Sequence, residues 1–151
     1  MDFGWEPFGR TRGDEPPAAP APPPAPGPTQ PIALPREPAR GLAVVSCMDC
    51  RIDPLQAFGL ALGDAVVLRN AGAQVSDDVL RSLRMAHAGL GVRAVRVVGH
   101  TDCLAHRGDD AVATAEVQRG MLRIAAALPD LEVWGALLDV RTGAVAPVVS
   151  A

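Results

Sequence analysis

The stretch Leu-Ala-Val-Val-Ser-Cys-Met-Asp-Cys-Arg, residues 42–51, joins a short apolar run to a polar segment that carries two thiols. An apolar run of this length predicts a strand buried on both faces, which is typical of a parallel sheet. Cys47 and Asp49 then follow at the carboxyl end of that strand, where open α/β sheets form their sites. This stretch therefore predicts the type of sheet and the place of a candidate site.

In the rest of the chain, strand patterns alternate with helix patterns, and turn residues separate them. The patterns predict strands at 64–69, 93–99, 132–140 and 144–149, and helices at 55–62, 76–90 and 109–128. Strands that alternate with helices indicate a doubly wound sheet. The predicted fold class is α/β, with a mostly parallel sheet of about four to five strands flanked by helices. The last two strands are expected to form an antiparallel hairpin.

Proline is concentrated before this domain, with twelve of the fifteen prolines in residues 1–40. Residues 16–31 are almost wholly Pro, Ala and Gly, a composition that favours an extended, disordered chain. We therefore predict a Pro/Ala-rich disordered tail at 1–40 and a folded domain at 41–151. The tail suits a solubilising spacer, or a ligand for a proline-binding groove of a partner. Phe3, Trp5 and Phe8 form an aromatic cluster ahead of it, with either a partner or the domain itself as a docking site.

Length and charge exclude several classes of function. The 151 residues are enough for one domain with a sizeable core. A net charge of -3, with no lysine in the chain, argues against binding of nucleic acid or of an anionic membrane surface. No apolar stretch is long enough to span a membrane. The first residues of the sequence lack a basic residue followed by an apolar run, the pattern of a secretory signal, so none is expected. Three cysteines fit a metal or catalytic site in a reducing, cytoplasmic compartment.

Two polar clusters are expected at neighbouring strand ends. Cys47 lies in the first cluster, and His100 and Cys103 lie in the second, directly after the strand predicted at 93–99. If the two strands are neighbours, these three side chains converge. Two thiolates and one imidazole suit Zn²⁺, and a set of three protein ligands leaves a position for water, as in catalytic zinc sites. Zinc lowers the pKa of that water to about 7.

Asp49 and Arg51 are the candidate catalytic pair. A carboxylate held by a guanidinium stays ionised and can orient a zinc-bound hydroxide, or it can swing onto the zinc and close the site. Cys50 is expected to be a spectator. Asp102 is expected either to hydrogen-bond a ligand residue or, as the simpler interpretation, to cap the turn that follows it. His106 is the candidate proton shuttle, because an imidazole titrates near neutrality.

The pattern Cys-x-Asp-x-Arg followed by His-x-x-Cys resembles the β-class carbonic anhydrase family, and its short bacterial members in particular. Residues 69–72 and 77–83 are also similar to segments of that family. The resemblance implies a zinc enzyme that reversibly hydrates carbon dioxide to bicarbonate and a proton through zinc-bound hydroxide. It implies Cys47, His100 and Cys103 as zinc ligands, Asp49 and Arg51 as the catalytic dyad, and a homodimer or larger homo-oligomer.

The chain departs from the family pattern at Leu104, where the family usually has glycine, and in the short segment 104–108 before the next helix. Three alternatives therefore stay open. Relatives in the family hydrolyse carbonyl sulfide or carbon disulfide on the same scaffold. A catalytically silent zinc-binding module with a partner-recruiting tail is a second alternative. A redox-active thiol protein that uses Cys47 and Cys50 is the third, although it leaves His100 and Cys103 unexplained.

Overall fold

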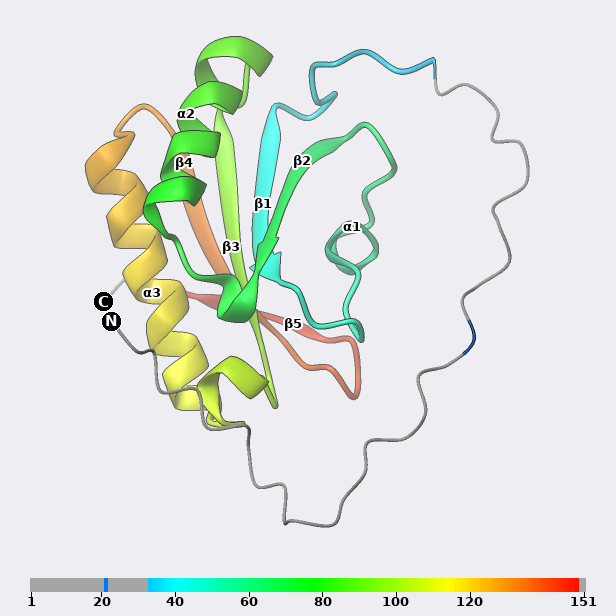
Figure 1. The fold of residues 1–151 in the computed structure, drawn as a ribbon, viewed down its shortest axis with the longest axis vertical. Helices are drawn as coiled ribbons and strands as arrows, with labels where there is room; N and C mark the ends of the chain where they lie inside the picture. The colour runs from blue at the N-terminus through cyan, green and yellow to red at the C-terminus, as the bar shows by residue number, and fades with distance from the viewer. Residues whose placement is uncertain (1–20, 22–32, 150–151) are drawn as a thin grey trace. The chain divides into compact units, whose positions relative to one another are not determined.

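A computed structural model gives the fold of the chain, and it describes residue 21 and residues 33–149. The strands alternate with helices along the described chain, as Figure 1 shows. The elements are β1 (Leu42–Cys47), α1 (Pro54–Ala57), β2 (Ala65–Asn70), the 3₁₀ turn η1 (Ala71–Ala73), α2 (Asp77–Leu90), β3 (Ala94–His100), the 3₁₀ turn η2 (Leu104–His106), α3 (Asp110–Ala127), β4 (Glu132–Leu138) and β5 (Val145–Val148).

The strands form one five-stranded sheet in the order β2-β1-β3-β4-β5. β1 pairs in parallel with both β2 and β3, β3 pairs in parallel with β4, and β5 runs antiparallel to β4. The sequence-based prediction of an α/β, doubly wound and mostly parallel sheet is confirmed. The strand order reverses between β1 and β3, so the carboxyl ends of these two strands meet where such sheets place their sites.

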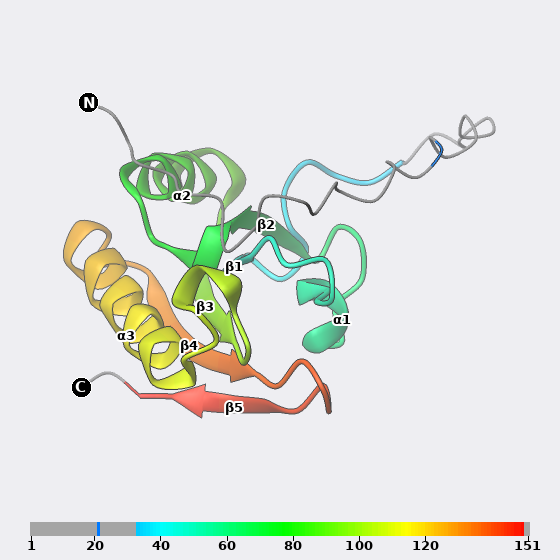
Figure 2. The ribbon, with the colours of Figure 1, turned by 60° about the horizontal axis from the view of Figure 1, so that its bottom comes forward.

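The two faces of the sheet are covered unequally. α2 and α3 lie on one face, and α1 is the helix of the described chain that lies on the other (Figure 2). The larger core packs under α2 and α3, and it includes Val45, Leu83 and Ile124, each 0% exposed. A smaller cluster around Val44 and Ile52 packs on the second face, towards α1. The sheet thus has a well-covered face and a partly covered face.

Helix ends follow the caps that the sequence provides. The Ser76 side chain accepts a hydrogen bond from the Val79 backbone at the start of α2, and the Asp109 carboxylate does so for α3. The prediction of a helix over 55–62 is wrong in its length, because α1 ends at Ala57. Gly59 has φ +62°, a left-handed backbone conformation that cannot continue a helix.

The disordered tail predicted over residues 1–40, and the docking of Phe3, Trp5 and Phe8, fall largely outside the described residues and stay predictions. The end of that range is described, and there the Ala39 and Arg40 amides donate to the backbone carbonyls of Gly63 and Asp64. Among the described residues, no helix is both long enough and apolar enough to cross a membrane.

Candidate metal centre

Cys47, His100 and Cys103 come together at the carboxyl ends of β1 and β3. Their candidate ligand atoms, two Sγ atoms and one imidazole nitrogen, all lie within 4.8 Å of one another. The two sulfurs are 3.9 Å apart, and all three residues are buried. β1 and β3 are hydrogen-bonded neighbours, and this pairing joins positions that are more than fifty residues apart in the chain.

The orientation of His100 fits a metal ligand. Its Nδ1 lies 2.8 Å from the Thr101 carbonyl oxygen, which fixes the ring and leaves Nε2 as the free nitrogen. That Nε2 is buried and has no hydrogen-bond partner among the described residues. Because a buried polar atom without a partner costs free energy, this Nε2 fits a metal ligand better than a structural imidazole. A zinc ion accepts this donor set of two sulfurs and one imidazole nitrogen.

The buried environment of Cys103 disfavours its thiolate unless a cation is present. Burial raises the pKa of the Cys103 thiol, and the neighbouring Cys47 raises it further. The Gly72 backbone amide lies 3.3 Å from the Cys47 sulfur and donates a hydrogen bond to it. A bound divalent cation offsets the cost of charge and deprotonates such thiols, so we expect metal binding to release protons.

Asp49 and Arg51 form the ion pair that the sequence predicts, at the edge of the ligand cluster. The guanidinium donates to both oxygens of Asp49, at 3.0 Å and 2.7 Å, and the Arg51 amide donates a third hydrogen bond at 2.9 Å. These bonds lower the pKa of the Asp49 carboxyl well below its usual range and raise the pKa of Arg51. One Asp49 oxygen lies 3.9 Å from Nε2 of His100, which places an ionised acceptor beside the ligand atoms.

Asp102 completes this arrangement in a way that was not anticipated. The sequence suggested a capping role for it, whereas its carboxylate accepts from Arg51 at 2.7 Å and its carbonyl accepts at 3.0 Å. Arg51 thereby links the loop after β1 to the loop after β3. Asp102 adopts φ +53°, and its amide donates to Asp110 at the start of α3. Its position between His100 and Cys103 was the signal that could have found it.

Arg69 is a second residue whose role the sequence did not reveal. From β2, its guanidinium donates to the carbonyl oxygens of Cys47, Asp49 and Ile52. Three bonds from one side chain fix the backbone of the loop that carries Cys47 and Asp49. The signal was present in the segment Arg-Asn-Ala-Gly at 69–72, which begins at the last residue of the strand predicted over 64–69.

The remaining residues singled out by sequence lie around the cluster. Cys50 is exposed, in contrast to the two buried thiols. Leu104 is 70% exposed and its backbone is not among the left-handed positions, so the fold does not require glycine there. His106 is buried, with Nε2 3.1 Å from the Gly72 carbonyl oxygen. Its role as a proton shuttle stays a prediction, since the structure shows its Nε2 beside a backbone carbonyl and not exposed to solvent.

We expect Gly72→Ala to destabilise the protein by about 2 kcal/mol, because the change combines backbone strain with overpacking. Gly72 has φ +74°, and an added Cβ would lie 2.8 Å from Nε2 of His106. Urea unfolding measures the effect. Gly89→Ala in α2 is the matched control: nothing lies within 4 Å of its Cβ position, so a gain of up to about 1 kcal/mol is expected there. Equal effects of the two substitutions would contradict this account of the η1 turn.

Comparison with known proteins places this geometry in a family. The family model described as carbonic anhydrase matches residues 42–130, more than half of the chain. "Beta-carbonic anhydrase 1" of Mycobacterium tuberculosis is 46% identical over 70 residues, which cover 46% of this chain and 43% of the relative. "Carbon disulfide hydrolase" of Saccharolobus solfataricus is 35% identical over 100 residues, which cover 62% of this chain and 48% of that relative. The chain thus aligns with less than half the length of these curated relatives.

Solved structures agree with the sequence matches. A carbonic anhydrase from Streptococcus mutans superposes with a TM-score of 0.73 at 33% identity, covering 80% of this chain and 88% of that one. A carbonic anhydrase from Glaciozyma antarctica superposes with a TM-score of 0.67 at 28% identity, covering 78% and 86%. The family match spans both motif loops and the strands that bring them together. From its sequence and its fold alike, the chain belongs to the β-class carbonic anhydrase family.

Proposed function

We propose that this protein is a zinc-dependent carbonic anhydrase, a lyase that reversibly hydrates carbon dioxide to bicarbonate and a proton. The observation that carries the proposal is the convergence of Cys47, His100 and Cys103, together with the buried Nε2 of His100, which has no hydrogen-bond partner in the part of the chain that the structure describes. These three residues would hold the ion. Two thiols and one imidazole leave the fourth position of a tetrahedral zinc site without a protein ligand.

Zinc bound there would supply a nucleophile at neutral pH by lowering the pKa of a water molecule. The residues of the chain supply its orientation. Asp49 stays ionised because Arg51 holds both of its oxygens. It would accept a hydrogen bond from the nucleophile and so orient the lone pair of the nucleophile's oxygen towards carbon dioxide. In this structure Asp49 is paired with Arg51, an arrangement that keeps its carboxylate available as an acceptor.

Stopped-flow hydration of carbon dioxide by the zinc-loaded full chain tests the proposal. We expect turnover above the uncatalysed rate, with the proton released to buffer. Stoichiometric zinc without turnover over a range of pH would reject the catalytic part of the proposal. It would favour the catalytically silent zinc-binding module, the alternative that rests on Leu104 and the short segment 104–108.

Carbon disulfide hydrolysis is a second candidate, favoured by curated relatives of that name that match this chain at 35–42% identity. A headspace assay for hydrogen sulfide, run on the same preparation as the hydration assay, separates the two substrates. We expect carbon dioxide to be the faster substrate. Sulfide release at a higher rate than carbon dioxide hydration would reverse the assignment.

The cellular setting follows from the ligands. Cys47 and Cys103 must stay reduced to bind zinc, and their sulfurs lie close together. We therefore propose a reducing compartment, the cytoplasm. We also propose that the protein works as a homo-oligomer, a dimer or larger.

We expect Asp102→Ala to lower kcat about tenfold while zinc content stays unchanged, because Arg51 loses a partner that steadies it against Asp49. Asp102→Asn should recover part of the loss, since its amide oxygen still accepts from the guanidinium. Zinc content and stopped-flow rates of the same samples check this. The control is Asp53→Ala, which removes a loop carboxylate that caps α1 and has no hydrogen bond or ion pair with Arg51 among the described residues. Loss of zinc in Asp102→Ala would instead assign Asp102 a role in holding the loop between His100 and Cys103.

A further inference from the structure

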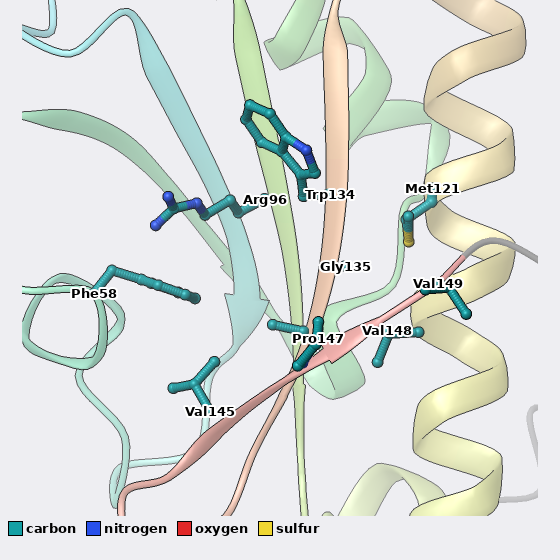
Figure 3. A pocket seen from close by; sticks show the side chains of 10 residues that line it. Phe58, Arg96, Met121, Trp134, Gly135, Val145, Pro147, Val148 and Val149 are labelled. Carbon is teal, nitrogen blue, oxygen red and sulfur yellow. The ribbon is translucent and has the colours of Figure 1, made fainter.

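His106 is a buried side chain to which the proposed mechanism gives no part. Within the described residues, three polar side chains are buried: Ser46, His100 and His106. The apolar groove over β3, β4 and β5 holds none of them (Figure 3). Ser46 precedes a candidate ligand in β1, and His100 is itself a candidate ligand. Buried polar side chains are rare unless hydrogen bonds satisfy them, so His106 needs a partner of its own.

The imidazole of His106 bonds to the turn that supports Cys47. Its Nε2 lies 3.1 Å from the Gly72 carbonyl oxygen. A carbonyl oxygen only accepts hydrogen bonds, so Nε2 carries the hydrogen and donates it. The amide of the same Gly72 donates to the Cys47 sulfur at 3.3 Å. One glycine therefore links His106 to a candidate zinc ligand.

Each sulfur of the metal centre accepts hydrogen bonds from one of the two 3₁₀ turns. η1 donates the Gly72 amide to Cys47. Burial raises the pKa of the Cys103 thiol, and the backbone amides of Ala105 and His106, both in η2, lower it by hydrogen bonding. The His106 side chain joins η2 to η1. It thus fixes the two turns that contact the two sulfurs relative to each other.

The backbone around these turns is strained. Within the described chain, the residues other than glycine with positive φ are Ala73, Asp102 and Arg107, at +56°, +53° and +56°. Ala73 lies in η1, Arg107 follows η2, and Asp102 lies between two candidate ligands. Such conformations persist only where the surrounding contacts hold them. His106 supplies a contact of this kind, because it bonds to the peptide group that joins Gly72 to Ala73.

We propose that His106 is a positioning residue of the metal centre: through Gly72 it holds η1 so that the Gly72 amide donates to the Cys47 sulfur. The inference rests on the proposed zinc site and adds to it a residue outside the three ligands. An amide that donates to a thiolate stabilises its negative charge, and the thiolate is the form that binds zinc. This role needs an N–H that stays in place, whereas a proton shuttle needs a proton that leaves.

Zinc competition between the full chain and a chelator of known affinity tests the proposal. We expect His106→Leu to weaken zinc binding about tenfold, the lower end of what partners outside the ligand set contribute. His106→Gln should recover most of the affinity, because its amide nitrogen can donate in place of Nε2. Far-UV circular dichroism verifies folding. If His106→Leu does not fold, His106→Asn replaces it, since that side chain is polar and too short to place an amide at the position of Nε2.

His87→Leu is the matched control. Nδ1 of His87 lies 2.7 Å from the Val92 carbonyl oxygen beyond the end of α2, so this change removes a bond of the same kind at a place outside the metal centre. Zinc affinity should stay unchanged in this variant. Urea unfolding of both leucine variants measures their stability, which shows whether zinc affinity follows the lost bond to η1 or the free energy of unfolding.

Cobalt substitution gives a second measurement that a purely structural role would not change. Co²⁺ binds to the same kinds of ligand as zinc, and its charge-transfer band with sulfur reports the electron density on the thiolates. A thiolate that loses a hydrogen bond is a stronger electron donor. We therefore expect the band to shift to longer wavelength in His106→Leu, to return in His106→Gln, and to stay in place in His87→Leu.

The outcomes separate this inference from the proposed function. Unchanged zinc affinity and an unchanged cobalt band in a folded His106→Leu chain would overturn the inference and leave the proposed enzyme standing. A fall in kcat that imidazole buffer restores, at unchanged zinc affinity, would overturn it in favour of the proton shuttle. An unmodified chain that binds no zinc would overturn both.

Discussion

Cys47→Ala should remove the stoichiometric zinc and, with it, the hydration of carbon dioxide. The Cys47 sulfur lies 3.9 Å from that of Cys103 and belongs to the only cluster of three candidate ligands found in the described chain. With this sulfur gone, two protein ligands remain, and a catalytic zinc site needs three. We expect kcat/KM to fall by more than about a hundredfold, beyond what the loss of an outer partner costs.

Metal analysis after dialysis, followed by stopped-flow assays of the same samples, measures both effects. Cys50→Ala is the matched control, because this thiol is three residues away in the same loop and is exposed. It should keep one zinc per chain and full activity. If instead Cys50→Ala loses zinc and Cys47→Ala keeps it, the ligand assignment is wrong.

Asp49→Asn should lower kcat by about a hundredfold or more and leave the zinc content unchanged, a magnitude typical of losing a positioned proton acceptor. An asparagine side chain carries no charge, and Arg51 no longer has an ionised partner at this position. The amide also presents hydrogen-bond donors where the carboxylate only accepts. The nucleophile then loses the group that orients it.

The control for this change is Asp78→Asn, which alters a carboxylate paired with Arg81 on the surface of α2. Exposed pairs of this kind contribute little, so its rate and stability should match those of the unmodified chain. An Asp49→Asn protein with normal kcat would show that the Asp49–Arg51 pair is structural rather than catalytic.

Much of the fold could be predicted because its signals are local. The apolar run at 42–45 and the alternation of strand and helix patterns depend on neighbouring residues, and the structure confirms the sheet they indicate. The order of the two motifs also pointed to adjacent strand ends. The convergence of Cys47 with Cys103 followed from one assumption, that β1 and β3 are neighbours, and the register of these strands bears it out.

The parts that sequence reasoning missed depend on contacts between distant segments. Arg51 reaches Asp102 across 51 positions, and Arg69 bonds to carbonyl oxygens about twenty positions earlier. The residues next to Asp102 in the sequence favour a turn cap. They give no sign that Arg51, from the loop after β1, bonds to its carboxylate. The length of α1 was also missed, because the left-handed backbone of Gly59 is set by how the segment packs.

Extended X-ray absorption fine structure at the zinc edge of the zinc-loaded full chain tests the central claim most directly, because it gives the type and distance of the atoms bound to the metal. The account predicts two sulfurs at about 2.3 Å and two lighter atoms at about 2.0–2.1 Å, of which one is an imidazole nitrogen. Cys47, Cys103 and His100 supply the three protein ligands. A third sulfur in the shell, or a shell without sulfur, would contradict it.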